Sequence, residues 1–180
     1  GRADSLTGGA YLNRISDTDF NLGNDLTFAL RIAFKTHSAT NPAAQENILD
    51  MSDATDNDQV HIFFATDGTI TARVTDDARV SYDSVDPAAD YYDALWHDLW
   101  LIFDGGTFYV YVDGKLSAST AQSNVNTSLD PTEVWIGASY AAGTTLACTV
   151  TEPIIAKGFG STNIATSVEW LYRRSLAGQQ

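Results

Sequence analysis

The chain has 180 residues, enough for one domain with a sizeable hydrophobic core. Its net charge of −13 argues against nucleic acid and anionic membranes as partners, because both bind clustered Lys and Arg. No apolar run is long enough to span a bilayer, and a single cysteine, Cys148, rules out an internal disulfide. The N-terminus has no signal-peptide pattern and no Met, so we expect a chain processed or cut from a longer one.

Apolar and polar residues alternate with period two along most of the chain, which is typical of half-buried β-strands. After a first strand over residues 10–15, the clearest example is "LTFALRIAFKT" at 26–36, where Phe28, Leu30, Ile32 and Phe34 share one face. Further strands are expected over residues 47–51, 60–65, 69–75, 79–82, 96–103, 107–112, 115–119, 133–136 and 148–156. Asp-Gly pairs at 67–68, 104–105 and 113–114 suit hairpin turns.

These elements predict an all-β, two-sheet antiparallel sandwich. We expect a single domain over residues 1–180, with its core from about residue 10 to 176. Nineteen of the 23 acidic residues are Asp, a turn and cap residue, which also favours a loop-rich β protein. One short helix is expected near the C-terminus, since residues 166–169 fit a capping box and Ile164, Val168, Leu171 and Tyr172 share a face.

The segment "ALWHDLWLIFDGGTFYVYVDGKL" at 94–116 predicts a β-hairpin whose strand register follows from its turn. A two-residue turn at Gly105-Gly106 sets Phe103 opposite Phe108, and the pairing then continues to Leu99 opposite Val112. One face is wholly apolar and belongs in the core: Leu99, Leu101, Phe103, Phe108, Val110 and Val112.

The opposite face of this hairpin carries a second apolar group, the aromatic patch of Trp100, Ile102, Tyr109 and Tyr111. A sandwich needs only one buried face per sheet, so this patch is surplus to the core. Either a loop, the terminal helix or a neighbouring subunit covers it, or Trp100, Tyr109 and Tyr111 form a platform for a sugar or protein ligand. The sequence leaves both interpretations open.

The chain resembles the laminin-G-like branch of the concanavalin-A-like jelly rolls. "LTFALRIAFKT" is similar to the early fTxsfWvkt strand, "ALWHDLWLIFDGG" to WHhvaltfDG, "FYVYVDGKL" to lYvDGkl and "VWIGASY" to the lxIG strand. The beginning, "GGAYLNRISDTDFNLGNDLTFAL", also looks like the start of such domains in phage tail and virion-surface proteins. One departure is Ala33-Phe34, where the family commonly has a Trp, so any role of that ring does not transfer.

This resemblance implies a two-sheet jelly roll that serves as a non-catalytic recognition or assembly module on a virion surface or outside the cell. We expect a glycan or a surface protein as ligand, with homo-oligomer or virion neighbours as further candidate partners. The alternative is a purely structural subunit, such as a tail, fibre or capsid decoration protein, with its aromatic patch buried in the assembly.

Catalysis has one weak candidate, His61. The glycoside hydrolases of this fold use a Glu-x-Asp-x-x-Glu strand, which is not found here. The polysaccharide lyases use Gln, then Ile or Val, then His, and Gln59-Val60-His61 supplies that pattern. Their Arg-rich and tyrosine-bearing strands do not appear, so we expect no enzyme and keep a lyase around His61 only as an alternative. We expect His97 to be structural and Cys148 to be buried.

Aspartates are dense in "DMSDATDNDQ", residues 50–59. Carboxylate oxygens this close together can hold calcium, and calcium is common at the rim of laminin-G-like sheets. Asp53, Asp56 and Asp58 are therefore the candidate ligands, although the spacing is not that of an EF-hand, and solvated turn aspartates are the plainer explanation. No cofactor is required by anything in the sequence.

Overall fold

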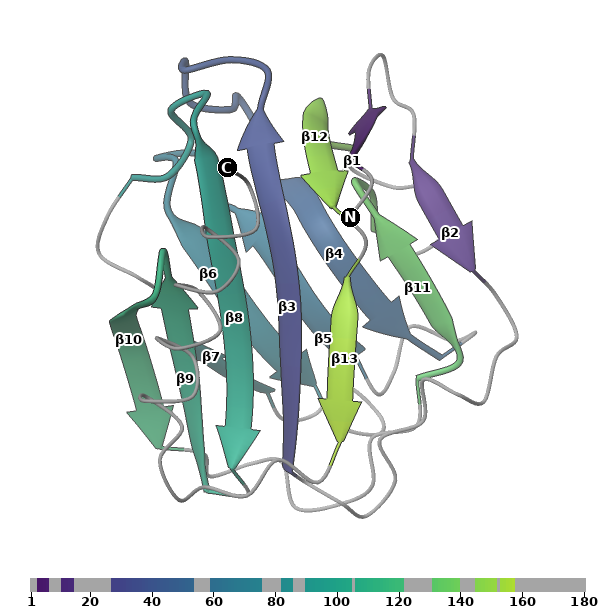
Figure 1. The fold of residues 1–180 in the computed structure, drawn as a ribbon, viewed down its shortest axis with the longest axis vertical. Coiled ribbons are helices and arrows are strands. Elements are labelled where there is room, and N and C mark those ends of the chain that lie inside the picture. Colours follow the sequence, from purple (N-terminus) through teal and green to yellow (C-terminus); the bar gives the residue numbers. More distant parts are fainter. Residues whose placement is uncertain are drawn as a thin grey trace, which may run out of the picture.

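The structure is a computed structural model that describes residues 3–6, 11–14, 27–53, 59–75, 82–85, 90–104, 106–121, 131–139, 145–151 and 153–157. Within these residues the chain forms two antiparallel sheets, which lie face to face (Figure 1), and no helix. The all-β jelly-roll sandwich is therefore confirmed. The expected C-terminal helix lies outside the described residues.

Sheet A has seven strands and lies in front in Figure 1. Its order is β1 (Ala3–Leu6), β12 (Cys148–Thr151), β3 (Thr27–Thr36), β8 (Trp96–Asp104), β9 (Thr107–Val112) and β10 (Lys115–Ala121), and β13 (Ile154–Lys157) also pairs with β3. Sheet B has six strands behind it. Its order is β2 (Leu12–Arg14), β11 (Glu133–Ile136), β4 (Glu46–Ser52), β5 (Gln59–Phe64), β6 (Ile70–Thr75) and β7 (Tyr82–Val85).

The core lies between the sheets, and period-two alternation places its side chains there. Phe28, Leu30, Ile32 and Phe34 of β3 are at most 1% exposed, as their shared face predicts. Phe34 meets Phe64 of sheet B edge-on, with ring centroids 5.4 Å apart. Burying each such side chain contributes roughly 1.5–3 kcal/mol, so these contacts hold the two sheets together.

The β8–β9 hairpin has the register expected from its Gly-Gly turn. Phe103 pairs with Phe108 and Leu99 with Val112, and the three pairs between them also match. All six residues of the predicted core face belong to the main hydrophobic cluster. Asp104 stabilises the turn, because its Oδ1 accepts from the N–H groups of Gly106 and Thr107 at 3.2 and 2.9 Å.

Two expected strands differ from those observed, and one observed strand was not expected. The strand over 148–156 is two strands, β12 and β13, which both pair with β3; Pro153 lies between them and has no N–H for a ladder. The strand over 79–82 is observed as β7 at Tyr82–Val85, and residues 79–81 lie outside the described part. The short edge strand β1 was not expected, because four residues carry too little alternation to recognise.

Three connections lie at the upper end of the sandwich in Figure 1, which we call the loop end: residues 37–45, 65–69 and 90–95. Asn41 Nδ2 donates to the carbonyl of Asp67 at 2.7 Å, and the N–H of Tyr91 donates to the carbonyl of Gly68 at 3.2 Å. Gly68 has φ +82° and no room for a Cβ, which would lie 2.3 Å from Asp90 Oδ1. This position therefore requires glycine.

Candidate recognition site

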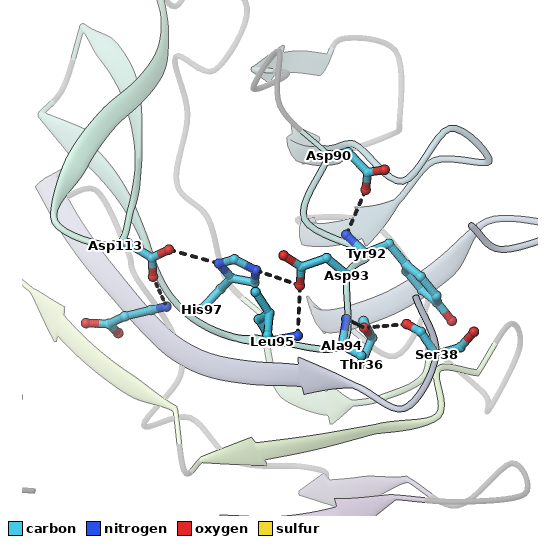
Figure 2. A network of polar contacts seen from close by, with 10 residues as sticks. Thr36, Ser38, Asp90, Tyr92, Asp93, Ala94, Leu95, His97 and Asp113 are labelled. Atoms are coloured by element: carbon cyan, nitrogen blue, oxygen red, sulfur yellow. Dashed lines mark hydrogen bonds and ion pairs between the residues drawn. The ribbon is translucent and has the colours of Figure 1, made fainter. Parts of the chain in front are cut away.

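His97, the second residue of β8, is held on both sides at the loop end. Its Nδ1 lies 2.9 Å from Asp113 Oδ2, and its Nε2 lies 3.0 Å from Asp93 Oδ1 (Figure 2). Carboxylate oxygens only accept, so both contacts are hydrogen bonds when the ring carries both protons. The ring is 8% exposed, and Tyr91 packs edge-on against it with centroids 5.1 Å apart.

The two carboxylates extend this link into the backbone. Asp113 Oδ1 accepts from the N–H of Asp98 at 2.9 Å, while Asp93 Oδ1 also accepts from the N–H of Leu95 at 2.8 Å. Figure 2 shows the resulting chain of contacts from the β9–β10 turn, through the imidazole, to the 90–95 loop. His97 thus fixes both connections to the start of β8.

Ala94 adds a backbone constraint to the same loop. Its φ of 62° lies in the left-handed region, which is uncommon for a residue with a side chain and costs on the order of 1 kcal/mol. The conformation is held from β3, because the N–H of Ala94 donates to Thr36 Oγ1 at 3.0 Å and that hydroxyl donates to the carbonyl of Ser38 at 2.8 Å. Strain maintained by several contacts is a feature of functional loops.

The constrained loop presents two large apolar side chains to solvent. Leu95 is 61% exposed and Trp96 is 48% exposed. Among the described residues Leu95 is the most exposed large apolar side chain, and Trp96 is the only exposed Trp. The pair Leu95-Trp96, held by the Asp93–His97–Asp113 link, is therefore the best candidate recognition site in the described part of the chain.

The aromatic patch lies on the outer face of sheet A as expected, but it is largely covered. Trp100 is 6% exposed and Tyr111 is 5% exposed, while Tyr109 is half-buried. Ala29 and Ala156 pack against the patch. Burial also raises the pKa of the Tyr111 hydroxyl. Trp100 and Tyr111 therefore have little exposed surface for a sugar to contact. This favours the interpretation that the patch is covered over the interpretation that it is a binding platform.

A partly buried ion pair borders this patch. Arg31 Nε lies 2.7 Å from Asp98 Oδ1, and the Trp100 indole N–H points at Asp98 Oδ2 at 3.4 Å. Burial raises the pKa of Asp98, against the opposing influence of the Arg31 guanidinium. Arg31 also lies 5.8 Å from the centroid of the Trp100 ring. Both oxygens of Asp98 are thus engaged by these two neighbours.

His61 lies on the outer face of sheet B and is 6% exposed. Its Nε2 contacts the amide oxygen of Asn47 and therefore carries a proton. Burial, and then the charge of Arg73 on β6, lower the pKa of His61 to about 3, so the ring is neutral at neutral pH. Gln59, the other polar residue of the lyase-like pattern, donates to both oxygens of Asp50 at 3.0 and 2.9 Å. Both residues are thus engaged in contacts within the sheet.

The candidate calcium ligands are only partly described. Asp53 is half-buried just after β4, whereas Asp56 and Asp58 lie outside the described residues. In the part of the chain that the structure describes, no group of three or more Asp, Glu, His or Cys is placed to hold a metal ion. The same residues contain no helix that is long and apolar enough to cross a membrane.

Cys148 is fully buried, and burial raises the pKa of its thiol to about 12, so the thiol is unreactive.

Comparison with known proteins assigns the family. A laminin G family model, described as the Concanavalin A-like lectin/glucanases superfamily, matches residues 6–153. The chain belongs to the concanavalin A-like lectin/glucanase superfamily. This confirms the resemblance in the strand motifs, and a laminin-G-like member is a binding domain more often than an enzyme. A search of curated proteins finds no match.

Solved structures agree with this concanavalin A-like fold. The receptor-binding domain of botulinum neurotoxin D aligns with a TM-score of 0.75 at 13% identity, covering 96% of this chain and 43% of that one. Domains LG4-5 of the mouse laminin alpha1 chain give 0.60 at 16% identity, covering 86% and 41%. A heptameric SAP-like pentraxin from Limulus polyphemus gives 0.66 at 13% identity, covering 94% and 81%. The chain thus spans less than half of the toxin and laminin structures.

Sequence reasoning did not find the Leu95-Trp96 site. Trp96 was assigned to a strand and His97 to a structural role, and Asp113-Gly114 was interpreted only as a turn. The available signal was one imidazole, His97, with two carboxylates, Asp93 and Asp113, close to it in the sequence. Nothing in the local pattern distinguishes an exposed ring at the start of a strand from a buried one.

Proposed function

We propose that this domain is a non-enzymatic recognition module that binds a glycan or a surface protein through Leu95 and Trp96. The observation that carries the proposal is an exposed indole, 48% accessible, at the start of β8, directly after a loop held by the Asp93–His97–Asp113 link. A flat apolar ring with a polar N–H suits the face of a sugar and equally an interface anchor. A loop held in place before binding loses less conformational entropy when the ligand arrives.

We place this module outside the cell or on a virion surface. The resemblance of its beginning to phage tail and virion-surface domains supports the virion, and the net charge of −13 suits a salty extracellular medium. The related structures named above include a toxin receptor-binding domain and laminin domains, which supports a surface setting in general.

Replacing Trp96 by Ala is expected to weaken binding to any glycan that the wild type takes by at least about tenfold, since buried aromatic anchors dominate such contacts. Isothermal titration of both proteins with one array-identified glycan measures this. Leu116→Ala is the matched control, because Leu116 is 53% exposed on β10, which β9 separates from β8. Equal affinities for wild type and Trp96→Ala would refute the assignment of the site.

We also retain calcium as a proposal, carried by Asp53, Asp56 and Asp58 together with the family resemblance. A bound ion stabilises the folded chain by mass action, so the melting temperature is expected to be higher with calcium than with chelator. The triple variant with Asn at these three positions should lose that difference. The same melting temperature with calcium and with chelator would remove the calcium assignment.

A further inference from the structure

We propose that the ligand of Trp96 is an acidic sugar, one with a carboxylate or a sulfate, whose anionic group binds Lys35. This rests on the proposed function, because it deepens the account of the same site. It assigns a chemical class to the ligand and a second contact residue to the protein.

The sheet register places Lys35 beside Trp96. The two residues pair across β3 and β8, at the end of β3 nearest the loop end. Lys35 alternates with Phe34, which points into the core, so its side chain stands on the outer face with Trp96. Directly paired residues of antiparallel strands have Cβ atoms roughly 5 Å apart. A sugar stacked on the exposed indole would therefore have the ammonium of Lys35 at its edge.

The charge of Lys35 is not paired with a carboxylate among the described residues. The chain has 23 acidic residues and only 10 Lys and Arg, so a basic side chain on its surface is expected to find a carboxylate. Arg31, which lies four residues before Lys35 on the same face of β3, forms an ion pair with Asp98. Lys35 makes no ion pair with any of the residues that the structure describes.

Asp98, an acidic residue on the same outer face of sheet A, is already engaged. Asp98 follows Trp96 on the outer face of β8, but its two oxygens bind Arg31 Nε at 2.7 Å and the Trp100 indole N–H at 3.4 Å. The half-buried Lys35 therefore lies next to an apolar ring with no described carboxylate paired to it. A ligand with one flat apolar face and one anionic group complements both features.

Two further polar side chains, Thr149 and His37, lie beside Lys35 on the outer face of sheet A. Thr149 of β12 pairs with Lys35 on its other side. Its hydroxyl lies 3.1 Å from Nε2 of His37, whose side chain is exposed. Trp96, Lys35, Thr149 and His37 thus follow one another across the outer face of sheet A. Hydroxyl and imidazole groups beside the cation suit the hydroxyls of a sugar, which a simple anion lacks.

The test measures binding of the intact chain to 3′-sialyllactose, a heparin hexasaccharide and neutral lactose, for the wild type and Lys35→Gln. The first two probes separate a carboxylate from a sulfate as the source of the charge. We expect at least one acidic probe to bind more tightly than lactose, and Lys35→Gln to weaken it by about tenfold, the usual loss for a charge-assisted hydrogen bond. Lys115→Gln is the control for the loss of one lysine, because Lys115 is an exposed lysine on β10, which β9 separates from β8. Melting temperatures of all variants confirm folding.

The other outcomes are distinct. The acidic-sugar inference is wrong if lactose binds as tightly as the acidic probes. It is also wrong if Lys35→Gln binds an acidic probe as tightly as the wild type does while Trp96→Ala does not bind it. In either case the Trp96 site stands. If no probe binds and a wider array is also blank, both the inference and a glycan-binding function are overturned.

Discussion

Acidification is expected to destabilise the wild-type chain much more than the variant His61→Gln. Burial and Arg73 lower the pKa of His61 from 6.5 to about 3 in the folded chain. Between these values the unfolded chain binds a proton that the folded chain does not, so stability falls as the pH falls. The loss is roughly 1.4 kcal/mol for each pH unit below the ordinary pKa of histidine. Gln carries no such proton, so this part of the acid sensitivity should disappear.

Urea unfolding of both proteins at pH 7, 6, 5 and 4 measures the effect as a difference in slope. The carboxylates contribute equally to both proteins, so they cancel in the comparison. His37→Gln is the matched control, because it makes the same substitution at an exposed histidine at the loop end. Parallel pH profiles for wild type and His61→Gln would show that the buried ring is protonated as easily as a free one.

His97→Leu is expected to lower the free energy of unfolding by about 2–3 kcal/mol. Hydrogen bonds to charged groups are each worth about 1.5–3 kcal/mol, and this change removes two of them. The partner carboxylates of Asp93 and Asp113 are 36% and 37% exposed, so solvent screening brings the loss below the sum for two such bonds. Leu is close to His in size, so little of the loss should come from a cavity.

A double-mutant cycle isolates this link. Asp113→Asn should destabilise the wild type by more than it destabilises His97→Leu, because the partner is already gone in the second case. We also expect His97→Leu to weaken ligand binding at Trp96, since the 90–95 loop would lose one of its anchors. Additive effects of the two substitutions would contradict a direct interaction between these side chains.

The β8–β9 hairpin shows what the sequence alone can determine. Its Gly-Gly turn fixes the register, and period-two alternation then assigns every side chain to a face, so Leu99 to Phe103 and their partners were placed correctly. The core of β3 was predictable for the same reason. Local patterns of this kind depend only on neighbours in the chain and on one turn.

Period-two alternation assigns a side chain to the outer face of a sheet, but it does not show whether other parts of the chain cover that side chain. The pattern that placed Trp100 and Tyr111 on an outer face could not show that they are buried there. The candidate site was missed for a related reason. His97 meets Asp113 across 16 residues, and Ala94 meets Thr36 across 58, so these contacts appear only when the strands are assembled.

The measurement that tests the central claim most directly is a broad glycan array probed with the wild type and Trp96→Ala side by side. We predict at least one bound glycan for the wild type and loss of that signal for Trp96→Ala, with Leu116→Ala retaining it. A glycan bound equally by wild type and Trp96→Ala would contradict a recognition site at Leu95 and Trp96. A blank array for the wild type would contradict glycan recognition altogether and favour a structural subunit of an assembly.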